Sequence, residues 1–383
     1  MPRPDDDVGR PRKGDVFPAG ISVSVWSRLT GNVQPADGRH ADSSAIVTAM
    51  NTTTLRRAVA ASLIAVMPLI GTACSTDNAT TATTSATSVS ASAISDTSTT
   101  AESPDLATLQ AEVTDLFEQY EYTDAETGLT LPYNLYLPED YDPSQTYPLV
   151  LYIADSSLVG QDVTAPLSEY GALIWASESE QAENESIVLV PEYPEVIIDD
   201  HGSYTTTDYV EMTARLVEAV SSEYSVDPDR VYGTGQSMGC MTVMALAAAH
   251  PELFAAELFV SGQWDITQLE NLTDETFFYI AAAGDENASG GQAEVQQMLD
   301  DAGVSYNTAT WDATWSAQES ADAAAELLAA GDDINFATFA EGTVLEAAGS
   351  TDSSGPQNSE HMASFQPAYE IEALRDWLFA QSA

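Results

Sequence analysis

The fold of this chain is decided by the stretch Val231-Tyr232-Gly233-Thr234-Gly235-Gln236-Ser237-Met238-Gly239-Cys240. β-Branched and aromatic residues come first, a Gly-x-Ser-x-Gly turn follows, and a long apolar run over residues 241–249 comes after the turn. This order predicts a strand, a tight turn and a helix, with Ser237 at the turn. Glycines are needed beside Ser237 because a serine in so sharp a turn has strained dihedrals, and larger neighbours would collide with the strand and the helix.

The predicted turn gives Ser237 a chemical role. It lifts the hydroxyl clear of the sheet and places it at a helix N-terminus, where backbone N–H groups can stabilise an oxyanion. We therefore predict that Ser237 is a nucleophile. The alternative is a glycine-rich strand-to-helix turn that only packs tightly.

The composition excludes two classes of partner. The chain has 383 residues, with 60 acidic and 11 basic side chains and a net charge of −49. All but three of the basic residues lie before residue 58, the three being Arg215, Arg230 and Arg375. Such a surface repels nucleic acid and anionic membranes, so we expect neither as a partner. The charge suits cationic substrates or high salt, or it only keeps the protein soluble.

The N-terminal segments predict export. Residues 1–49 are polar and lack periodicity, and we interpret them as a gene-model extension before a true start at Met50. Residues 50–73 hold a basic segment and then an apolar stretch that is too short for a confident membrane span, as in an export signal. The sequence around Cys74 resembles a bacterial lipoprotein signal, in which the cysteine is lipidated, although Gly71 stands where leucine is usual.

We expect an exported, cell-surface lipoprotein that contacts the membrane only through this lipid. Cleavage at the same bond by ordinary signal peptidase, followed by secretion, is the second choice. Residues 74–103 are mostly Ser, Thr and Ala after Cys74, which predicts a disordered spacer before an ordered domain over 104–383. Cys240 falls on an expected buried helix face, so we expect a core residue and no disulfide with Cys74.

Strand and helix patterns alternate along the ordered domain. Residues 147–153 and 186–191 are continuous apolar runs, as in strands that are buried on both faces. Residues 206–224 have the apolar spacing of an amphipathic helix. The alternation predicts an α/β fold with a mostly parallel central sheet and helices on both faces.

A serine hydroxyl is a poor nucleophile near neutral pH, so Ser237 needs a base. His361 follows the last predicted strand and precedes the C-terminal helix, which places it at the carboxyl edge of the sheet. His250 ends a helix that runs away from the serine, and His201 lies in a polar loop. We predict His361 as the base and keep His201 as the alternative.

The base needs a carboxylate that orients the imidazole and stabilises its protonated form. Asp285 directly follows a predicted strand over residues 276–281, in a turn of small residues. Asp265 ends the preceding strand and is the alternative. Because the carboxyl ends of parallel strands share one edge of the sheet, we predict that Asp285 meets His361 there.

Four stretches carry a family resemblance: residues 131–138, 147–151, 235–239 and 251–256. Through them, residues 128–383 resemble the α/β-hydrolase superfamily, and most of all bacterial secreted carboxylesterases and predicted peptidases related to polyhydroxybutyrate depolymerases and feruloyl esterases. The order Ser237, Asp285, His361 is the order expected in that superfamily. The resemblance implies an α/β-hydrolase fold and hydrolysis of an ester or amide through an acyl-enzyme, without a cofactor.

The segment after the central strand departs from the family pattern. The family usually has His-Gly-x-Gly there, whereas this chain reads Ala154-Asp155-Ser156-Ser157. We expect the backbone N–H of Met238 to be the first oxyanion donor and that of Asp155 or Ser156 to be the second. Loss of one such donor raises the barrier by about 3–4 kcal/mol, so the shape of this segment matters for activity.

Trp264 follows a strand near the expected cleft, so it either stacks on an aromatic acyl group or a sugar of the substrate, or packs in the core. No metal-ligand spacing, phosphate-binding glycine loop or nucleic-acid motif stands out, so we expect no metal and no cofactor.

The leading hypothesis is an exported serine hydrolase that cleaves a small-molecule or polymer ester. One alternative is a peptidase with the same three residues. Another is a non-catalytic binding protein on a hydrolase scaffold, which the altered segment at Asp155 keeps open. The oligomeric state does not follow from the sequence.

Overall fold

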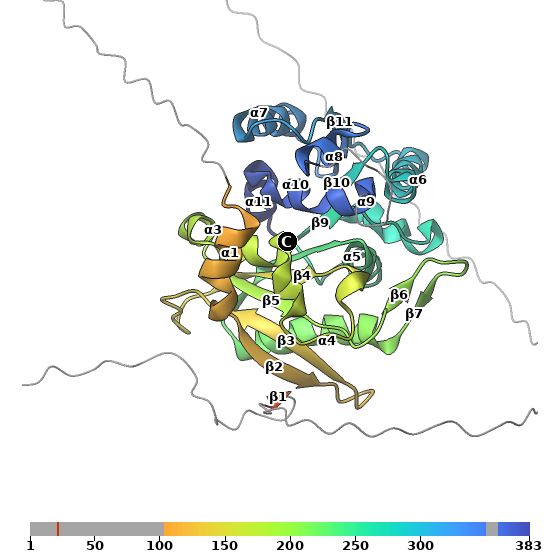
Figure 1. Ribbon diagram of the computed structural model, residues 1–383. Coiled ribbons are helices and arrows are strands. Elements are labelled where there is room, and N and C mark those ends of the chain that lie inside the picture. Colours follow the sequence, from red (N-terminus) through yellow and green to blue (C-terminus); the bar gives the residue numbers. More distant parts are fainter. Residues whose placement is uncertain (1–20, 23–102, 350–358) are drawn as a thin grey trace, which may run out of the picture. The chain divides into compact units, whose positions relative to one another are not determined.

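The computed structural model describes residues 21–22, 103–349 and 359–383 (Figure 1). The predictions about the start at Met50, the export segment 50–73, Cys74 and most of the spacer lie outside these residues. Within the described ranges, no helix is both long and apolar enough to span a bilayer.

A ten-stranded sheet runs through the domain in the order β1-β2-β3-β5-β4-β8-β9-β10-β12-β11. Its strands are β1 (Ile21–Ser22), β2 (Glu118–Thr123), β3 (Thr130–Tyr136), β4 (Tyr147–Ile153), β5 (Ile187–Pro191), β8 (Val226–Gln236), β9 (Ala256–Val260), β10 (Phe277–Ala282), β11 (Asn307–Trp311) and β12 (Asn335–Phe339). The strands from β5 to β11 in this order pair parallel with one another. The pairs β1–β2, β2–β3 and β3–β5 are antiparallel. A separate hairpin joins β6 (Ile198–Asp199) and β7 (Thr205–Thr206).

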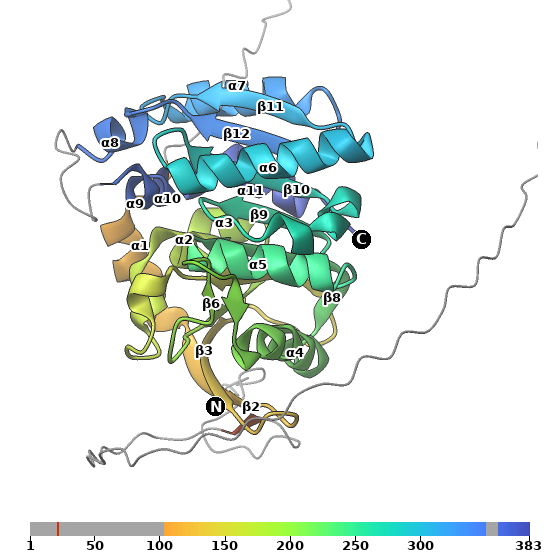
Figure 2. The same cartoon turned by 90° about the vertical axis from the view of Figure 1, so that its right-hand side faces the viewer.

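Helices cover both faces of this sheet (Figures 1 and 2). One hydrophobic cluster joins the sheet to α4 (Asp208–Glu223), α5 (Met238–Ala249) and α6 (Glu286–Ala302). A second cluster joins the other face to α1 (Leu106–Val113), α2 (Tyr170–Leu173), α7 (Ala317–Leu328), α10 (Phe365–Glu370) and α11 (Glu372–Phe379). The short helices α3 (Glu178–Glu183), α8 (Thr343–Ala347) and α9 (Glu360–Ala363) complete the set. The predicted α/β-hydrolase fold is confirmed.

Strand β4 shows why the central strands are apolar throughout. All of its residues are buried, because successive side chains enter the two opposite clusters. Leu149 and Leu151 pack on the side of α5, whereas Val150 and Tyr152 pack on the side of α10. A strand covered on both faces therefore loses the polar alternation of a half-exposed strand.

The predicted and observed elements differ mainly at their ends. The helix predicted over 206–224 is α4, which begins at Asp208 and ends at Glu223. The single predicted C-terminal helix is two helices, because Ile371 has extended dihedrals between α10 and α11. Helix α1 and strand β2 were not predicted; both are short, with 8 and 6 residues, so each offers only two or three large apolar residues as a signal.

Glu257 is an unusual residue of strand β9. Its side chain is fully buried, and within the described part of the chain neither carboxyl oxygen has a hydrogen-bond partner. Burial, together with the charge of Glu275, raises the pKa of Glu257 well above its ordinary value, so the neutral acid is the favoured form. A buried carboxyl without a partner destabilises the fold once the pH favours ionisation.

We predict that Glu257→Leu increases the stability of the protein more at pH 8 than at about pH 5.5. The pKa of Glu257 in the folded state lies above the unfolded value of about 4.3. The contribution of Glu257 to the free energy of unfolding is therefore fully present below about pH 4.3, and it is lost as the pH rises toward the folded-state pKa. The slope from this group is at most about 1.4 kcal/mol per pH unit. Urea unfolding of both proteins at the two pH values measures the difference. An equal gain at both values would contradict the assignment.

Candidate active site

Ser237 lies in the sharp turn between β8 and α5, with φ 51° and ψ −115°. A non-glycine residue in such a conformation stores about 1–3 kcal/mol of strain and persists only where its surroundings hold it. Here the Ser237 N–H donates to the carbonyl of Val260 at 3.1 Å, and its carbonyl accepts from the N–H of Met241 at 3.0 Å. The turn is therefore fixed from β9 on one side and from α5 on the other.

The two glycines of the motif allow the close approach that the turn requires. A Cβ atom on Gly235 would lie 2.6 Å from the carbonyl carbon of Gly239 and 2.7 Å from the carbonyl oxygen of Ile153. A Cβ atom on Gly239 would overlap the same oxygen of Ile153. Since all of these neighbours are backbone atoms, they cannot move aside as a flexible side chain could.

The structure brings Ser237, Asp285 and His361 together in one hydrogen-bonded chain. His361 Nδ1 lies 2.6 Å from Asp285 Oδ2, and His361 Nε2 lies 2.9 Å from Ser237 Oγ. A carboxylate can only accept, so Nδ1–H donates to Asp285 and the lone pair of Nε2 faces the serine hydroxyl. This is the arrangement that a serine nucleophile and its base require.

Asp285 is held from a second direction. It is the N-cap residue of α6, and its Oδ1 accepts from the N–H of Ala288 at 3.3 Å while Oδ2 faces His361. Its side chain is almost fully buried. The alternative, Asp265, uses its carboxylate within its own turn, where it accepts from Thr267 and Gln268. The Asp285 carboxylate therefore contacts His361, whereas the Asp265 carboxylate stabilises its own turn.

Two buried serines hold the backbone of the histidine turn. Ser364 Oγ donates to the carbonyl of His361 at 2.7 Å, and Ser261 Oγ lies 2.7 Å from Ser364 Oγ. Ser261 follows β9 and has a positive φ of 48°. The sequence did not point to this pair, because the two serines are 103 residues apart and neither belongs to a motif.

The other two histidines in the described ranges, His250 and His201, contact carboxylates instead of Ser237. His250 Nε2 faces Glu211 at 3.0 Å, at the end of α5. His201, the alternative base, is exposed in the β6–β7 loop with Nδ1 2.8 Å from Asp199. The hydrogen bond to Asp199 and the charge of Asp200 raise the pKa of His201. The ligand atoms of Asp199, Asp200 and His201 lie within 4.8 Å of one another. His201 contacts both carboxylates and is exposed, whereas Asp199 and Asp200 are partly buried.

The segment that departs from the family pattern is shaped by Asp155. Asp155 is buried after β4, and its Oδ1 accepts from the N–H of Ser157 at 2.7 Å. Its Oδ2 accepts from Gln236, the neighbour of Ser237, at 3.3 Å. Ser156 begins a short 3₁₀ helix and is exposed. A local side-chain turn thus occupies the place of the usual glycine-rich loop.

Glu169 is the carboxyl neighbour of Asp155. Burial and the neighbouring Asp155 carboxylate raise the pKa of Glu169 well above its ordinary value, so Glu169 keeps its proton and donates to Asp155. Burial also acts to raise the pKa of Asp155, but hydrogen bonds from Glu169 and Ser157 outweigh it and leave that pKa below the usual value. Tyr152 donates to Glu169 at 2.6 Å. The opposite directions of the two pKa shifts favour the negative charge on Asp155 rather than on Glu169.

Trp264 packs inside the protein. Its side chain is 2% exposed and meets the ring of Tyr204 edge-on, with the ring centroids 5.0 Å apart. A buried indole offers no face to a substrate, so the structure gives Trp264 the packing role rather than the stacking role. Tyr204 is 44% exposed and is the more accessible ring of the pair.

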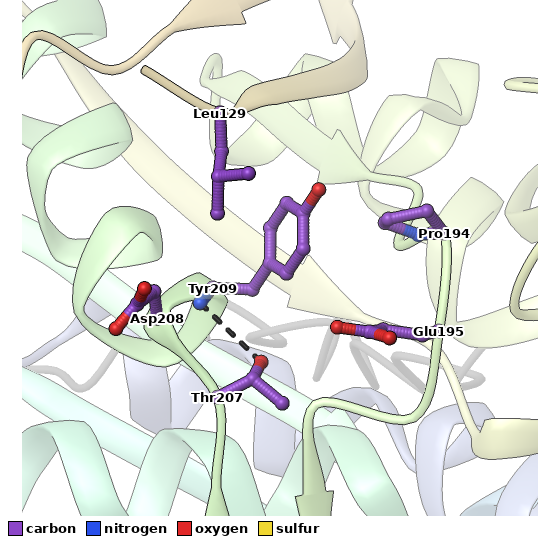
Figure 3. A pocket seen from close by; sticks show the side chains of 6 residues that line it. All are labelled: Leu129, Pro194, Glu195, Thr207, Asp208 and Tyr209. Carbon is purple, nitrogen blue, oxygen red and sulfur yellow. Dashed lines mark hydrogen bonds between the residues drawn. The ribbon is translucent and has the colours of Figure 1, made fainter. Parts of the chain in front are cut away.

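Two cavities lie apart from this hydrogen-bonded chain, and none of its three residues lines either one. The first, of about 330 Å³, lies where α4 begins, with the ring of Tyr209 between Leu129 and Pro194 (Figure 3). The second, of about 550 Å³, has Trp311 and Trp315 in its wall. The geometry around Ser237, and not the size of a cavity, identifies the candidate active site.

Known proteins resemble parts of this chain. Dipeptidyl-peptidase 5 of Porphyromonas gingivalis is 30% identical over 152 residues, which are 37% of this chain and 21% of that protein. Acetylxylan esterase A of Aspergillus ficuum is 47% identical over 49 residues, which are 13% of this chain and 16% of that protein. The chain thus spans about a fifth of the length of these relatives. The crystal structure of a thermostable esterase matches with a TM-score of 0.57 at 22% identity, covering 71% of this chain and 64% of that one.

A parallel sheet with a serine at the strand-to-helix turn and a histidine at its carboxyl edge defines the α/β-hydrolase class. Residues 125–338 match the model of the Esterase family, described as "Putative esterase". Since this match covers more than half of the chain, the protein belongs to the Esterase family.

We predict that Gly239→Ala destabilises the protein by about 1–3 kcal/mol, because its Cβ atom would press on a backbone carbonyl. Gly290→Ala is the matched control, since Gly290 lies inside α6 with no atom within 4 Å of an added Cβ atom. Alanine there is expected to stabilise by about 0.5–1 kcal/mol. Thermal or urea unfolding of both variants measures the contrast, and equal effects of the two substitutions would contradict the packing argument.

Proposed function

We propose that the protein is an exported serine hydrolase that cleaves a carboxylic ester through an acyl-enzyme, with Ser237 as nucleophile, His361 as base and Asp285 as the orienting acid. The observation that carries the proposal is the unbroken hydrogen-bonded chain from Asp285 Oδ2 through His361 to Ser237 Oγ, at 2.6 and 2.9 Å. Membership of the Esterase family supports the ester as substrate.

The steps of the reaction follow from the positions of the protons in this hydrogen-bonded chain. Ser237 Oγ attacks the ester carbonyl while His361 Nε2 takes its proton, and Asp285 stabilises the imidazolium that forms. The Met238 N–H, with that of Asp155 or Ser156 as the second donor, stabilises the oxyanion. His361 then returns the proton to the leaving alcohol. In the second half His361 takes a proton from water while the water oxygen attacks the acyl carbon. His361 then gives this proton to Ser237 Oγ as the bond between Oγ and the acyl carbon breaks, which releases the acid and restores Ser237.

A peptidase with the same residues is the second candidate. The similarity to a dipeptidyl-peptidase over 152 residues favours it, because the acyl-transfer steps are the same for an amide. A comparison of short p-nitrophenyl esters with peptide anilides separates the two substrates. The third candidate, a binding protein without catalysis, predicts hydrolysis of neither.

We predict that Ser237→Ala lowers kcat for p-nitrophenyl esters by about 10⁶-fold. Asp285→Asn is expected to lower it by about 10⁴-fold, because an amide stabilises the wrong imidazole tautomer. Asp265→Asn is the matched control and should keep the wild-type kcat, since Asp265 binds only its own turn. A full loss in Asp265→Asn with an active Asp285→Asn would reassign the acid.

We further propose that Cys74 is lipidated after export and anchors the protein at the cell surface. The support is the sequence alone, a basic and then apolar segment that ends in small residues before Cys74. The protein is expected in the membrane fraction of its native cells, and Cys74→Ser in the soluble fraction. Mass spectrometry of the mature N-terminus gives the answer directly. An unmodified Cys74 at the N-terminus would favour simple secretion.

A further inference from the structure

Glu360 connects three loops at the carboxyl edge of the sheet. Its Oε2 accepts from the N–H of Gly284 at 3.0 Å, and its Oε1 accepts from the N–H of Gly342 at 2.9 Å. Glu360 directly precedes His361, and Gly284 directly precedes Asp285. The Glu360 carboxylate therefore links three segments. They are the backbone beside His361, the backbone beside Asp285 and the loop after β12.

Helix α9 needs such contacts because it is too short to fix its own position. It has four residues, and its capping contact, from the Met362 N–H to Ser359 Oγ, is long at 3.4 Å. A single helical turn has little stability of its own. The turn is held on one side by Ser364, which binds the carbonyl of His361, and on the other side by the Glu360 carboxylate.

Gly284 leaves room for this carboxylate. A Cβ atom on Gly284 would overlap the carboxyl group of Glu360. Gly284 has no positive φ, so alanine could adopt its backbone conformation. The glycine is therefore needed for space, and the space is filled by Glu360. Both carboxyl oxygens of Glu360 accept from a backbone N–H, at 3.0 and 2.9 Å, so the group is fixed at two points.

We propose that Glu360 is a positioning residue. It holds the helical turn that carries His361 beside Asp285, so that His361 Nδ1 and Asp285 Oδ2 stay in contact. The inference deepens the proposed function and rests on it. The Glu360 carboxyl group bonds to backbone N–H groups and not to the side chains of Ser237, Asp285 or His361. It acts through the backbone of residues 284 and 361.

The first experiment replaces Glu360 by glutamine and by aspartate. Glutamine keeps one acceptor oxygen, but its NH₂ group would face a backbone N–H. Aspartate keeps the charge, but it is one methylene too short to reach both amides. Both variants are expected to lower kcat for p-nitrophenyl esters by about 10- to 100-fold with little change of KM, because displacement of a catalytic group by about 1 Å costs that much.

Glu346→Gln is the matched control, since it removes the same charge from an exposed position on α8 and should keep the wild-type kcat. If Glu360 acted on His361 only through its charge, Glu360→Asp would keep the wild-type kcat and pH profile while Glu360→Gln would not. That result would overturn the positioning role. Wild-type kcat in both Glu360 variants would overturn it as well.

A double-mutant cycle tests the route through Gly284. Gly284→Ala is expected to lower kcat by about 10-fold or more in the wild type, and to lower it no further in the Glu360→Ala background, where the overlapping carboxyl group is absent. The same fold-loss in both backgrounds would contradict the inference, because the methyl group would then act through something other than Glu360.

A crystal structure of Glu360→Gln gives a readout that does not need turnover. A separation of His361 Nδ1 and Asp285 Oδ2 beyond about 3.5 Å would support the positioning role, since no hydrogen bond remains at that distance. An unchanged contact would overturn it. A wild type that hydrolyses no ester contradicts the proposed function, whereas this structural comparison still decides the role of Glu360.

Discussion

The positive φ angle of Ser237 is the constraint on which the site depends. It turns the chain within one residue from β8 into α5, and this turn is compact only because two glycines let α5 approach the end of β4. The approach brings the first amide of α5 beside the segment after β4. The strain at one serine therefore places the hydroxyl, the helix N-terminus and the altered segment in one small volume.

The remaining parts of the site come from the parallel sheet. Asp285 and His361 follow β10 and β12, which are neighbours on one side of β8 and β9, so both reach the carboxyl edge near Ser237. Each is then fixed locally: Asp285 by capping α6, and His361 by the contacts of Ser364 and Glu360 around α9. The sheet gives the approximate position, and these hydrogen bonds give the distances of 2.6 and 2.9 Å.

The sequence was sufficient for the fold class and for the residues of the hydrogen-bonded chain. Apolar runs such as 147–153 identify buried strands, and alternation with helices identifies a parallel sheet. Position after a strand limits the carboxylate to Asp285 or Asp265, and the contact with His361 then identifies Asp285. Histidine is rare in the chain, which narrows the choice of base to very few residues.

The sequence was not sufficient for contacts between distant residues. The bonds from Glu360 to Gly284 and from Ser261 to Ser364 join residues 76 and 103 positions apart, and no local period or motif marks them. The turn formed by Asp155 stands in place of a glycine-rich loop. A comparison of motifs shows that the glycines are missing, but not which structure replaces them. Trp264 was ambiguous for a similar reason, since only the position of Tyr204 shows that the indole is covered.

The central claim is that Ser237 is a nucleophile with an oxyanion site formed by Met238 and the segment after β4. The most direct test is the crystal structure of the protein after reaction with a fluorophosphonate. We expect phosphorus bonded to Ser237 Oγ, and its oxygen about 2.7–3.1 Å from the N–H of Met238 and from one amide of Asp155 or Ser156. An unmodified Ser237, or a phosphoryl oxygen that reaches neither amide, would contradict the account.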